Sequence, residues 1–216
     1  MEPDATEIRV LGCLIEKQRT TPDAYPLSLN ALRLACNQST NRDPVVDYDE
    51  TTIRAALARL GRRRWTRTAS SHTSRAAKYR HLLDQELGLS DAETSVLCVL
   101  MLRGAQTPGE LKQRTERLHG FAGLDEVDET LGALIARDLV DRLARRPGQK
   151  EERYEQLLGG RPAAADEAPV RDAPAHDETK AAAATAAATD ERLDRLEREL
   201  TELRTELATL RESLGG

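Results

Sequence analysis

The residues that could carry out catalysis or bind a metal are few in this sequence and lie far apart. Cys13, Cys36 and Cys98 are widely separated, and the four histidines form neither an HExxH motif nor another paired ligand spacing. The motifs GxSxG, GxGxxG and GxxxxGK[ST], which mark nucleophile elbows and phosphate-binding loops, are also missing. The sequence therefore predicts a protein that is not an enzyme and that uses no metal and no other cofactor.

The cations show a clearer pattern, because they gather in two stretches of the chain. Lys and Arg neutralise the phosphates of nucleic acids, and this contact supplies nearly all of the affinity of non-specific DNA binding. The candidate nucleic-acid-binding residues are Arg54, Arg59, Arg62, Arg63, Arg64, Arg67, Arg75 and Lys78 in the first stretch and Arg145, Arg146 and Lys150 in the second. The alternative interpretation is a solvated surface on which these cations pair with nearby carboxylates.

Carboxylates precede both stretches and weaken the DNA hypothesis to different degrees. Asp47, Asp49 and Glu50 precede the first stretch, and residues 125–129 hold four carboxylates ahead of the second. Carboxylates repel phosphates, so the second part of the chain is predicted to be a poor reader of the major groove. Binding of a protein partner is at least as well supported for that part.

Helix caps and apolar spacing predict the elements that position these residues. Ser90 with Glu93 and Thr107 with Glu110 form capping boxes, each of which predicts the start of a helix. A third helix and two strands are expected over residues 125–137, 140–144 and 153–157. Three helices followed by a hairpin predict a winged helix-turn-helix.

The first part of the chain repeats this plan. Asp49-Glu50-Thr51 recurs as Asp128-Glu129-Thr130, an offset of 79 residues, and residues 78–83 recur as residues 153–158, an offset of 75. The expected elements are helices over 6–17 and 29–36, a short strand at Val45 and Val46, a third helix from Asp49, and wing strands over 65–68 and 76–81. The sequence thus predicts two winged helices in tandem.

The polar run from Asn37 to Arg42 has two interpretations. Its side chains could hydrogen-bond a nucleic acid or a peptide. Alternatively, Asn37 ends the second helix and the following residues satisfy the backbone of a turn, which is the interpretation we favour.

The C-terminal part of the sequence has a different composition. Residues 159–189 are rich in Ala and contain three Pro, which predicts a disordered linker. The tail that follows carries leucines spaced alternately by three and four residues, which is a heptad seam: Leu193, Leu196, Leu200, Leu203, Leu207, Leu210 and Leu214. This tail is predicted to form a coiled coil that joins two copies of the chain. The alternative is an amphipathic helix that folds back on its own domains.

Composition sets the class of protein. The chain has 216 residues, a net charge of -5, 39% hydrophobic residues and only 3% aromatic residues, which suits small helical modules. No stretch approaches the roughly 18 consecutive apolar residues of a membrane span, and the first 20 residues lack the pattern of a secretory signal. We therefore expect a soluble cytoplasmic protein with no membrane partner.

Three segments carry a resemblance to a known family. They are LGCLIEKQ (11–18), TTPDAYPLSLNALRLACNQSTNRDPV (20–45) and LRGAQTPGELKQR (102–114), and through them residues 5–158 resemble the YceH family of uncharacterised bacterial proteins. The resemblance implies two winged helices, often followed by a leucine-heptad tail. It implies no catalytic residue and no established activity.

These observations lead to one prediction of fold and function. The fold class is mainly α with small β wings, as two tandem winged helix-turn-helix domains (1–87 and 88–158), a linker (159–189) and a coiled-coil tail (190–214). The predicted function is that of a dimeric DNA-binding or transcription-associated protein, with double-stranded DNA as partner. The alternative function is an adaptor whose winged helices bind proteins without contacting DNA.

Overall fold

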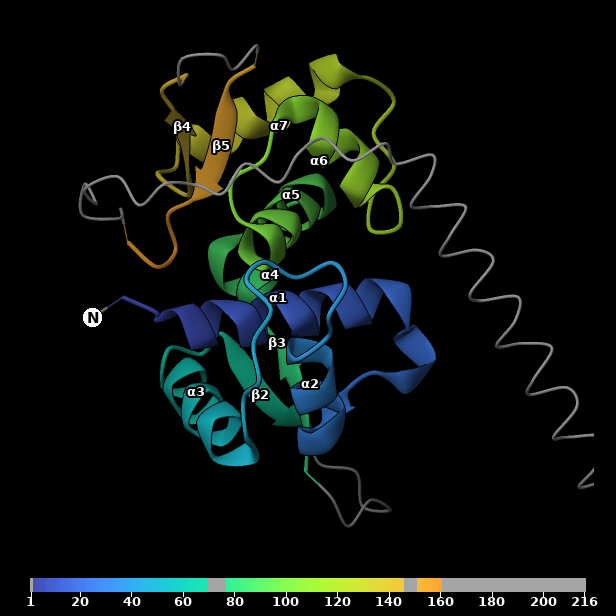
Figure 1. Cartoon of the computed structure of the whole chain (residues 1–216), viewed down its shortest axis with the longest axis vertical. Coiled ribbons are helices and arrows are strands. Elements are labelled where there is room, and N and C mark those ends of the chain that lie inside the picture. The colour runs from blue at the N-terminus through green and yellow to red at the C-terminus, as the bar shows by residue number, and fades with distance from the viewer. Residues whose placement is uncertain (1, 70–76, 146–150, 161–216) are drawn as a thin grey trace, which may run out of the picture. The chain divides into compact units, whose positions relative to one another are not determined.

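A computed structural model describes residues 2–69, 77–145 and 151–160 (Figure 1). The chain divides into two units, residues 1–163 and 164–216, and every described residue belongs to the first unit. The first unit is mainly helical with two small antiparallel sheets, which is compatible with the winged-helix fold. The linker, the tail with its seven leucines, Arg75, Arg146 and Lys150 lie outside the described residues.

The N-terminal half of this unit contains four helices, a short 3-10 turn and a three-stranded sheet. In chain order these elements are α1 (Ala5–Thr20), the 3-10 turn η1 (Pro22–Ala24), β1 (Leu27–Ser28), α2 (Leu29–Cys36), α3 (Glu50–Arg62), β2 (Thr66–Ala69), β3 (Lys78–His81) and α4 (Leu83–Leu87). The strand order is β1-β3-β2, with Thr66 paired to His81 and Leu27 paired to Tyr79. The sequence does not predict α4, a single turn that ends at Gly88, whose φ of 60° lies in the left-handed region that favours glycine.

The second half repeats the plan with three helices and a two-stranded hairpin. They are α5 (Asp91–Arg103), α6 (Pro108–Thr115), α7 (Leu124–Ile135), β4 (Val140–Leu143) and β5 (Arg153–Gln156). The predicted capping boxes are present: the Ser90 hydroxyl accepts from the Glu93 N–H at 3.1 Å, and the Thr107 hydroxyl accepts from the Glu110 N–H at 3.2 Å. These bonds satisfy N–H groups that a helix start leaves unpaired, which explains why both helices begin where the sequence predicts.

The predicted strand at Val45 and Val46 does not form. The strand that pairs with β3 opposite β2 is β1, and Val45 is 60% exposed. The backbone around these valines is bonded to side chains instead, since Arg9 Nη2 donates to the Pro44 carbonyl at 2.6 Å and the Tyr48 N–H donates to Asn37 Oδ1 at 2.9 Å. A pair of β-branched residues was therefore insufficient evidence for a strand.

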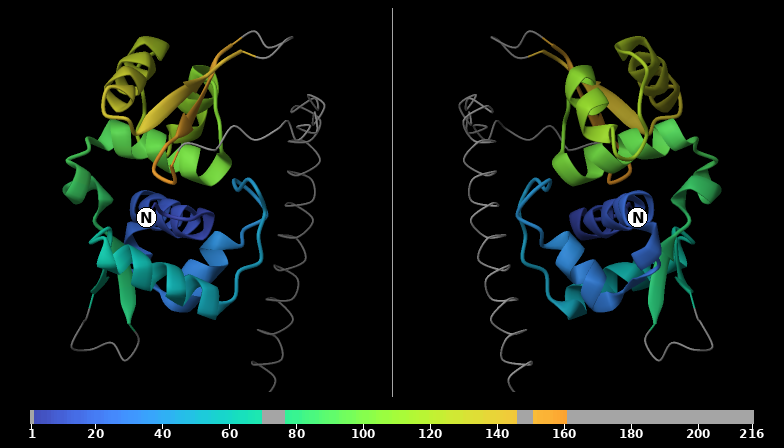
Figure 2. Two further views of the ribbon diagram at one scale, coloured as in Figure 1. Left: turned by 90° about the vertical axis from the view of Figure 1, so that its left-hand side faces the viewer. Right: turned by 90° about the vertical axis from the view of Figure 1, so that its right-hand side faces the viewer.

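The first helices of the two halves pack against each other and form the centre of the core. Nine consecutive residues are buried in each helix, from Glu7 to Ile15 in α1 and from Thr94 to Leu102 in α5. The ribbons show α1 between α5 on one side and α2 and α3 on the other, in both viewing directions (Figures 1 and 2). Close approach occurs at Gly12, where the Cys98 thiol donates to the Gly12 carbonyl at 3.4 Å.

The third helices correspond with an offset of 74 residues, so the offset of 79 taken from the Asp-Glu-Thr motif was wrong. The buried residues of the two helices are Ile53, Ala56, Leu57 and Leu60 in α3 and Val127, Thr130, Leu131 and Leu134 in α7. The motif misled because Asp49 is the N-cap of α3, whereas α7 begins at Leu124 and carries Asp128 in its second turn.

Both halves fasten the start of their first helix to the end of their third helix in the same way. Glu7 and Glu93 occupy the N3 position of their capping boxes. Arg63 Nε lies 3.8 Å from Glu7 Oε1, and Arg137 Nη1 lies 3.1 Å from Glu93 Oε1. Arg63 and Arg137 are again 74 residues apart, so the corrected offset is supported by contacts as well as by burial.

None of the helices in the described ranges is long and apolar enough to cross a membrane.

Candidate nucleic-acid interface

The outward face of α3 is built from small residues and arginines. With its apolar residues facing α1 and α2, the helix leaves Thr51, Arg54, Ala55, Ala58 and Arg62 exposed. This face, together with Gly61 and the exposed Arg67 of β2, is called the α3–β2 surface below. Because Ala and Gly project little beyond the helix backbone, a ligand can approach this helix closely.

A groove of about 300 Å³ lies between α3 and the β2–β3 hairpin. Its lining is Arg54, Leu57, Ala58, Gly61, Thr66, Arg67, Thr68 and Tyr79. The helix and the hairpin thus each contribute one arginine to an otherwise largely uncharged groove. Gly61 keeps it open, because the site of its missing Cβ has no atom within 4 Å.

Two of the predicted arginines serve the fold. Arg59 lies 2.6 Å from Asp4 and 3.1 Å from Glu7, so it ties α3 to the start of α1. Arg63 contacts the same Glu7 at 3.8 Å and stacks over the Trp65 ring at 5.7 Å. Because carboxylates of the protein neutralise these two arginines, their remaining positive charge attracts a phosphate only weakly.

Two further arginines pair more loosely at the surface. Arg54 lies 3.9 Å from Glu50 one turn earlier, and Arg64 lies 3.4 Å from Glu86. Both arginines are largely exposed, and exposed pairs of this kind contribute less than about 1 kcal/mol. Such pairs can exchange partners when a phosphate approaches.

The remaining predicted cations of the first half keep their charge available. Within the described ranges Arg62, Arg67 and Lys78 have no ion-pair partner, and Arg62 and Arg67 are exposed whereas Lys78 is half-buried. The structure thus divides the first stretch of predicted residues: Arg59 and Arg63 are structural, whereas Arg54, Arg62 and Arg67 share one surface.

The corresponding face of α7 carries the opposite charge. Asp125, Asp128 and Glu129 are exposed, and no ion pair neutralises them among the residues that the structure describes. Glu126 is the exception, since it lies 3.5 Å from His119 and accepts from the Ala122 N–H at 2.9 Å, which holds its pKa below the ordinary value. Of the second stretch of predicted cations, Arg145 is exposed beyond the end of β4.

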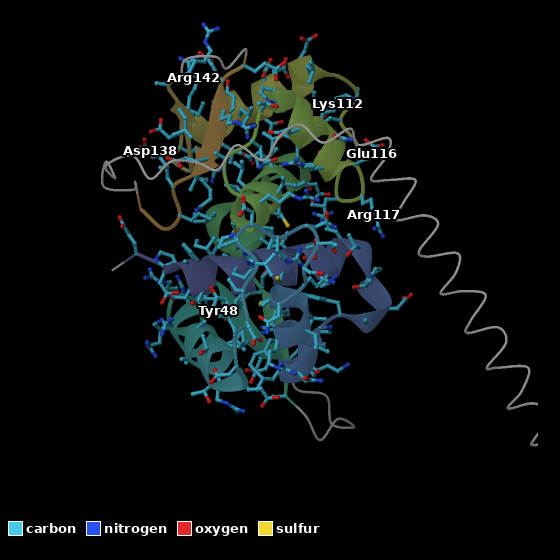
Figure 3. All side chains as sticks on the ribbon, viewed as in Figure 1. Tyr48, Lys112, Glu116, Arg117, Asp138 and Arg142 are labelled. Carbon is cyan, nitrogen blue, oxygen red and sulfur yellow. The ribbon has the colours of Figure 1, made fainter. Side chains whose placement is uncertain are left out.

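The polar run after α2 has the structural role that the sequence favoured. Asn37 Nδ2 donates to the Tyr48 carbonyl at 2.9 Å, and Asn37 Oδ1 accepts from the Tyr48 N–H at 2.9 Å. One amide group therefore pins the segment that leads into α3, and Tyr48 is labelled at this place in Figure 3. Asn37 positions the candidate interface without belonging to it.

A buried ion pair that the sequence does not predict holds the same loop. The Arg42 side chain is 0% exposed, and its guanidinium donates to Glu16 Oε2 at 2.6 Å and Glu16 Oε1 at 3.1 Å. It also donates to the Ala35 carbonyl at 3.1 Å and to Gln38 Oε1 at 2.7 Å. No spacing in the sequence indicates this contact, because Glu16 and Arg42 come from different elements and face each other only after α1 and α2 have packed.

A second buried polar cluster lies behind the hairpin. His81 is 2% exposed, its N–H donates to the Tyr25 hydroxyl at 2.8 Å, and its ring contacts the Gln18 amide oxygen. Burial lowers the pKa of His81 to about 4, so the ring is neutral at pH 7. The cluster joins α1, β3 and the segment before β1.

The three cysteines lie in the core. Cys13, Cys36 and Cys98 are all free and buried. Burial raises the pKa of Cys98, and the hydrogen bond with Cys13 together with burial raises the pKa of Cys36, so both are protonated thiols at neutral pH. No group of three or more potential metal ligands occurs among the described residues.

Comparison with known proteins identifies relatives along the whole chain. A family model described as "Protein of unknown function, DUF480" matches residues 4–149. A UPF0502 protein from Pelobacter propionicus is 50% identical over 210 residues, covering 95% of this chain and 92% of its own. A UPF0502 protein from Serratia proteamaculans is 44% identical over 218 residues, covering 98% of this chain and 96% of its own.

Proposed function

The chain belongs to the DUF480 family, and from the charge of its α3–β2 surface we propose that it is a tandem winged-helix protein that binds double-stranded DNA without catalysing a reaction. The UPF0502 relatives confirm the resemblance to the YceH family, because UPF0502 is that family. Neither family description names an activity, so the proposal depends on the residues of this chain.

The tandem winged-helix assignment is supported by the internal correspondence of the two halves. Each half has three helices followed by an antiparallel hairpin, with Arg67 opposite Arg80 in one and Asp141 opposite Glu155 in the other. A left-handed residue, Arg64 or Asp138, stands between the third helix and the hairpin in both. In winged helices the third helix enters the major groove and the hairpin contacts the backbone.

The observation that carries the DNA proposal is the set of available cations on the α3–β2 surface. Arg54 and Arg62 come from the helix and Arg67 from the hairpin, so both elements that would contact a duplex contribute charge. Arg is suited to this task because its guanidinium binds phosphate oxygens with two parallel hydrogen bonds. The DNA would lie across the groove, with phosphates at its arginine-bearing sides.

The carboxylates at the start of α3 oppose this proposal less than the sequence indicates. Asp49 caps the helix by accepting from the Thr52 N–H at 2.7 Å, and this bond lowers its pKa. Glu50 lies 3.9 Å from Arg54 in a loose, exposed contact that leaves Arg54 free to meet a phosphate. Asp49 is the N-cap and Glu50 the first residue of α3, whereas Arg62 is its last residue and Arg67 lies in β2.

The adaptor function remains the second candidate because of α7. Its exposed carboxylates repel phosphates, so this half is proposed to bind protein and not DNA. In a protein that combines both activities, the first half holds DNA and the second half holds a partner. A protein with the proposed DNA-binding function would work where the DNA is, which in a bacterial cell is the cytoplasm.

Salt dependence of DNA binding tests the proposal. Replacement of Arg54, Arg62 and Arg67 by Ala is expected to weaken binding to mixed genomic duplex fragments about 100-fold, if each phosphate contact contributes about 1 kcal/mol. The slope of log K against log salt should flatten by about 2.7, because each lost contact removes about 0.9 from it. Gel-shift titrations from 50 to 200 mM salt would measure both quantities.

A matched control removes equal charge from the other half. Lys112, Arg117 and Arg142, labelled on the second half in Figure 3, are replaced by Ala together and should leave the affinity within about threefold. Absence of binding by the unaltered protein even at 50 mM salt would leave the adaptor function in place. Equal losses in both triple variants would show that the α3–β2 surface is not the DNA site.

Self-association through the tail is a separate part of the proposal. The heptad leucines from Leu193 to Leu214 predict a parallel dimer, which would bring two α3–β2 surfaces to one duplex and raise the effective affinity. Sedimentation equilibrium at micromolar concentration and high salt, which screens contacts between charged surfaces, should give a dimer for the full chain and a monomer for a chain ending at residue 189. Equal masses for both chains would contradict a tail-mediated dimer.

A further inference from the structure

The two halves present faces of opposite charge at corresponding positions. With the offset of 74 residues, Arg54 of α3 corresponds to Asp128 of α7, and the neutral Thr51 and Ala55 correspond to Asp125 and Glu129. In β2 and β4, Arg67 corresponds to Asp141. One architecture therefore occurs twice in the chain, once with an excess of cations and once with an excess of carboxylates.

The α7 face also exposes large apolar side chains. Leu124 is 49% exposed and Ile135 is 37% exposed, and they account for two of the four large hydrophobic residues that are exposed in the described ranges. They are eleven residues apart, which places them on the same side of the helix, with Asp128 between them. A surface that combines apolar side chains with carboxylates is suited to a partner with an apolar groove and cations at its edges.

The groove of the α3–β2 surface has these properties. Gly61 occupies the position that corresponds to Ile135, so the first half lacks the side chain that the second half displays. Leu57, Ala58 and Tyr79 provide apolar lining, and Arg54 and Arg67 provide charge. Its volume of about 300 Å³ is enough for an aliphatic side chain, since a cavity of about 150 Å³ accommodates benzene.

We propose that α7 of one copy of this chain docks on the α3–β2 surface of a second copy, with Leu124 or Ile135 in the groove and the carboxylates of α7 against Arg54 and Arg62. The second copy is the partner because the chain itself carries both complementary surfaces. The contact joins two different patches, so it is heterologous, unlike the symmetric contact expected from the tail. The docking does not require DNA binding, but it uses the same arginines, so DNA and a second copy exclude each other from this surface.

Disulfide trapping between full-length copies tests the docking. Copies with Ala58→Cys are mixed with copies carrying Gly132→Cys, since Ala58 is exposed and the missing Cβ of Gly132 has no atom within 4 Å. Mild oxidation at low salt should yield at least tenfold more 58–132 cross-link than the control pair Asp23→Cys with Gly132→Cys. The tail is present in every mixture, so its contribution is the same in the test and in the control.

Charge reversal then identifies the recognised surface. Arg54→Glu with Arg62→Glu in the Ala58→Cys copy should lower the cross-link at least tenfold. Adding Asp128→Arg with Glu129→Arg to the Gly132→Cys copy should restore it, because the reversed surfaces are again complementary. Gly61→Ile adds a branched side chain at the groove, where its Cβ would have no atom within 4 Å, and it should also lower the cross-link.

Three results would overturn the docking: a test yield no higher than the control, an unchanged yield after charge reversal, or failure of the reversed pair to restore the cross-link. An unchanged cross-link yield with Gly61→Ile would show that the apolar side chain of α7 does not bind in the groove. No DNA is present in these mixtures, so the outcome is independent of whether the protein binds DNA.

Discussion

Replacement of Glu16 by alanine is expected to lower the free energy of unfolding by about 3–5 kcal/mol, the range found when one partner of a buried ion pair is removed. The reason is the environment of Arg42, whose side chain is 0% exposed and whose main carboxylate partner is Glu16. Loss of Glu16 leaves a guanidinium in the interior with only neutral hydrogen-bond acceptors. Urea titrations analysed by linear extrapolation would measure the change.

Two comparisons show whether burial is the cause. Glu152→Ala breaks the exposed pair between Arg142 and Glu152, which are 3.2 Å apart, and should cost less than about 1 kcal/mol. The double variant Glu16→Met with Arg42→Met removes both charges and should be less destabilised than the sum of its single variants. A loss in Glu16→Ala that is no larger than that in Glu152→Ala would contradict this account.

The same ion pair should make stability depend on acid. Burial acts to raise the pKa of Glu16, but the hydrogen bond and charge of Arg42 outweigh it and hold the pKa below the ordinary value of 4.5. The stabilisation is therefore complete above about pH 4.5 and is lost as the pH falls through the lower pKa of the folded state. The difference in the free energy of unfolding between the unaltered protein and Glu16→Gln should shrink below pH 4.5. Protonation of His81 changes the stability of both proteins alike, so it cancels in this difference.

Local signals in the sequence predicted the helices well. The bounds of α2 agree at both ends with the predicted residues 29–36, and the starts of α5 and α6 agree with capping boxes, because capping depends on residues three positions apart. Such features require no knowledge of which elements pack together.

Features that depend on packing could not be predicted in the same way. The third strand of the sheet is Leu27–Ser28 and not Val45–Val46, because the pairing partner of β3 is decided by the path of the chain after η1. The difference between Arg59, which pairs with Asp4 and Glu7, and Arg62, which is available, depends on where α1 lies relative to α3. Sequence charge alone grouped these residues as one candidate site.

The correspondence between the halves required burial as well as sequence letters. The Asp-Glu-Thr motif supported an offset of 79, and only the buried residues of α3 and α7 show that the offset is 74. The corrected offset aligns Arg54 with Asp128 and Gly61 with Ile135, which is the basis of the proposed docking. A short matching motif is therefore weaker evidence than a matching apolar period.

The substitution Gly12→Ala is expected to destabilise the protein by about 1–3 kcal/mol, the usual cost of overpacking a core. Gly12 lies in the middle of α1, where alanine would ordinarily stabilise a helix by about 1 kcal/mol. A Cβ at this position would meet Leu102 Cδ2 at 2.9 Å and Met101 Cβ at 3.1 Å. Leu102 is only 3% exposed, and Met101 Cβ is fixed to the backbone of α5 and cannot rotate away, so the steric cost is expected to exceed the gain in helix propensity.

Gly61→Ala provides the matched control, because the same change is made in a helix at an exposed position. Its Cβ would have no atom within 4 Å, so the substitution should stabilise the protein by about 0.5–1 kcal/mol through helix propensity alone. Opposite signs for the two variants in urea unfolding would establish that α1 and α5 are in close contact in solution. A stabilising effect at both positions would mean that the two first helices are further apart, and that the halves are held together by other contacts.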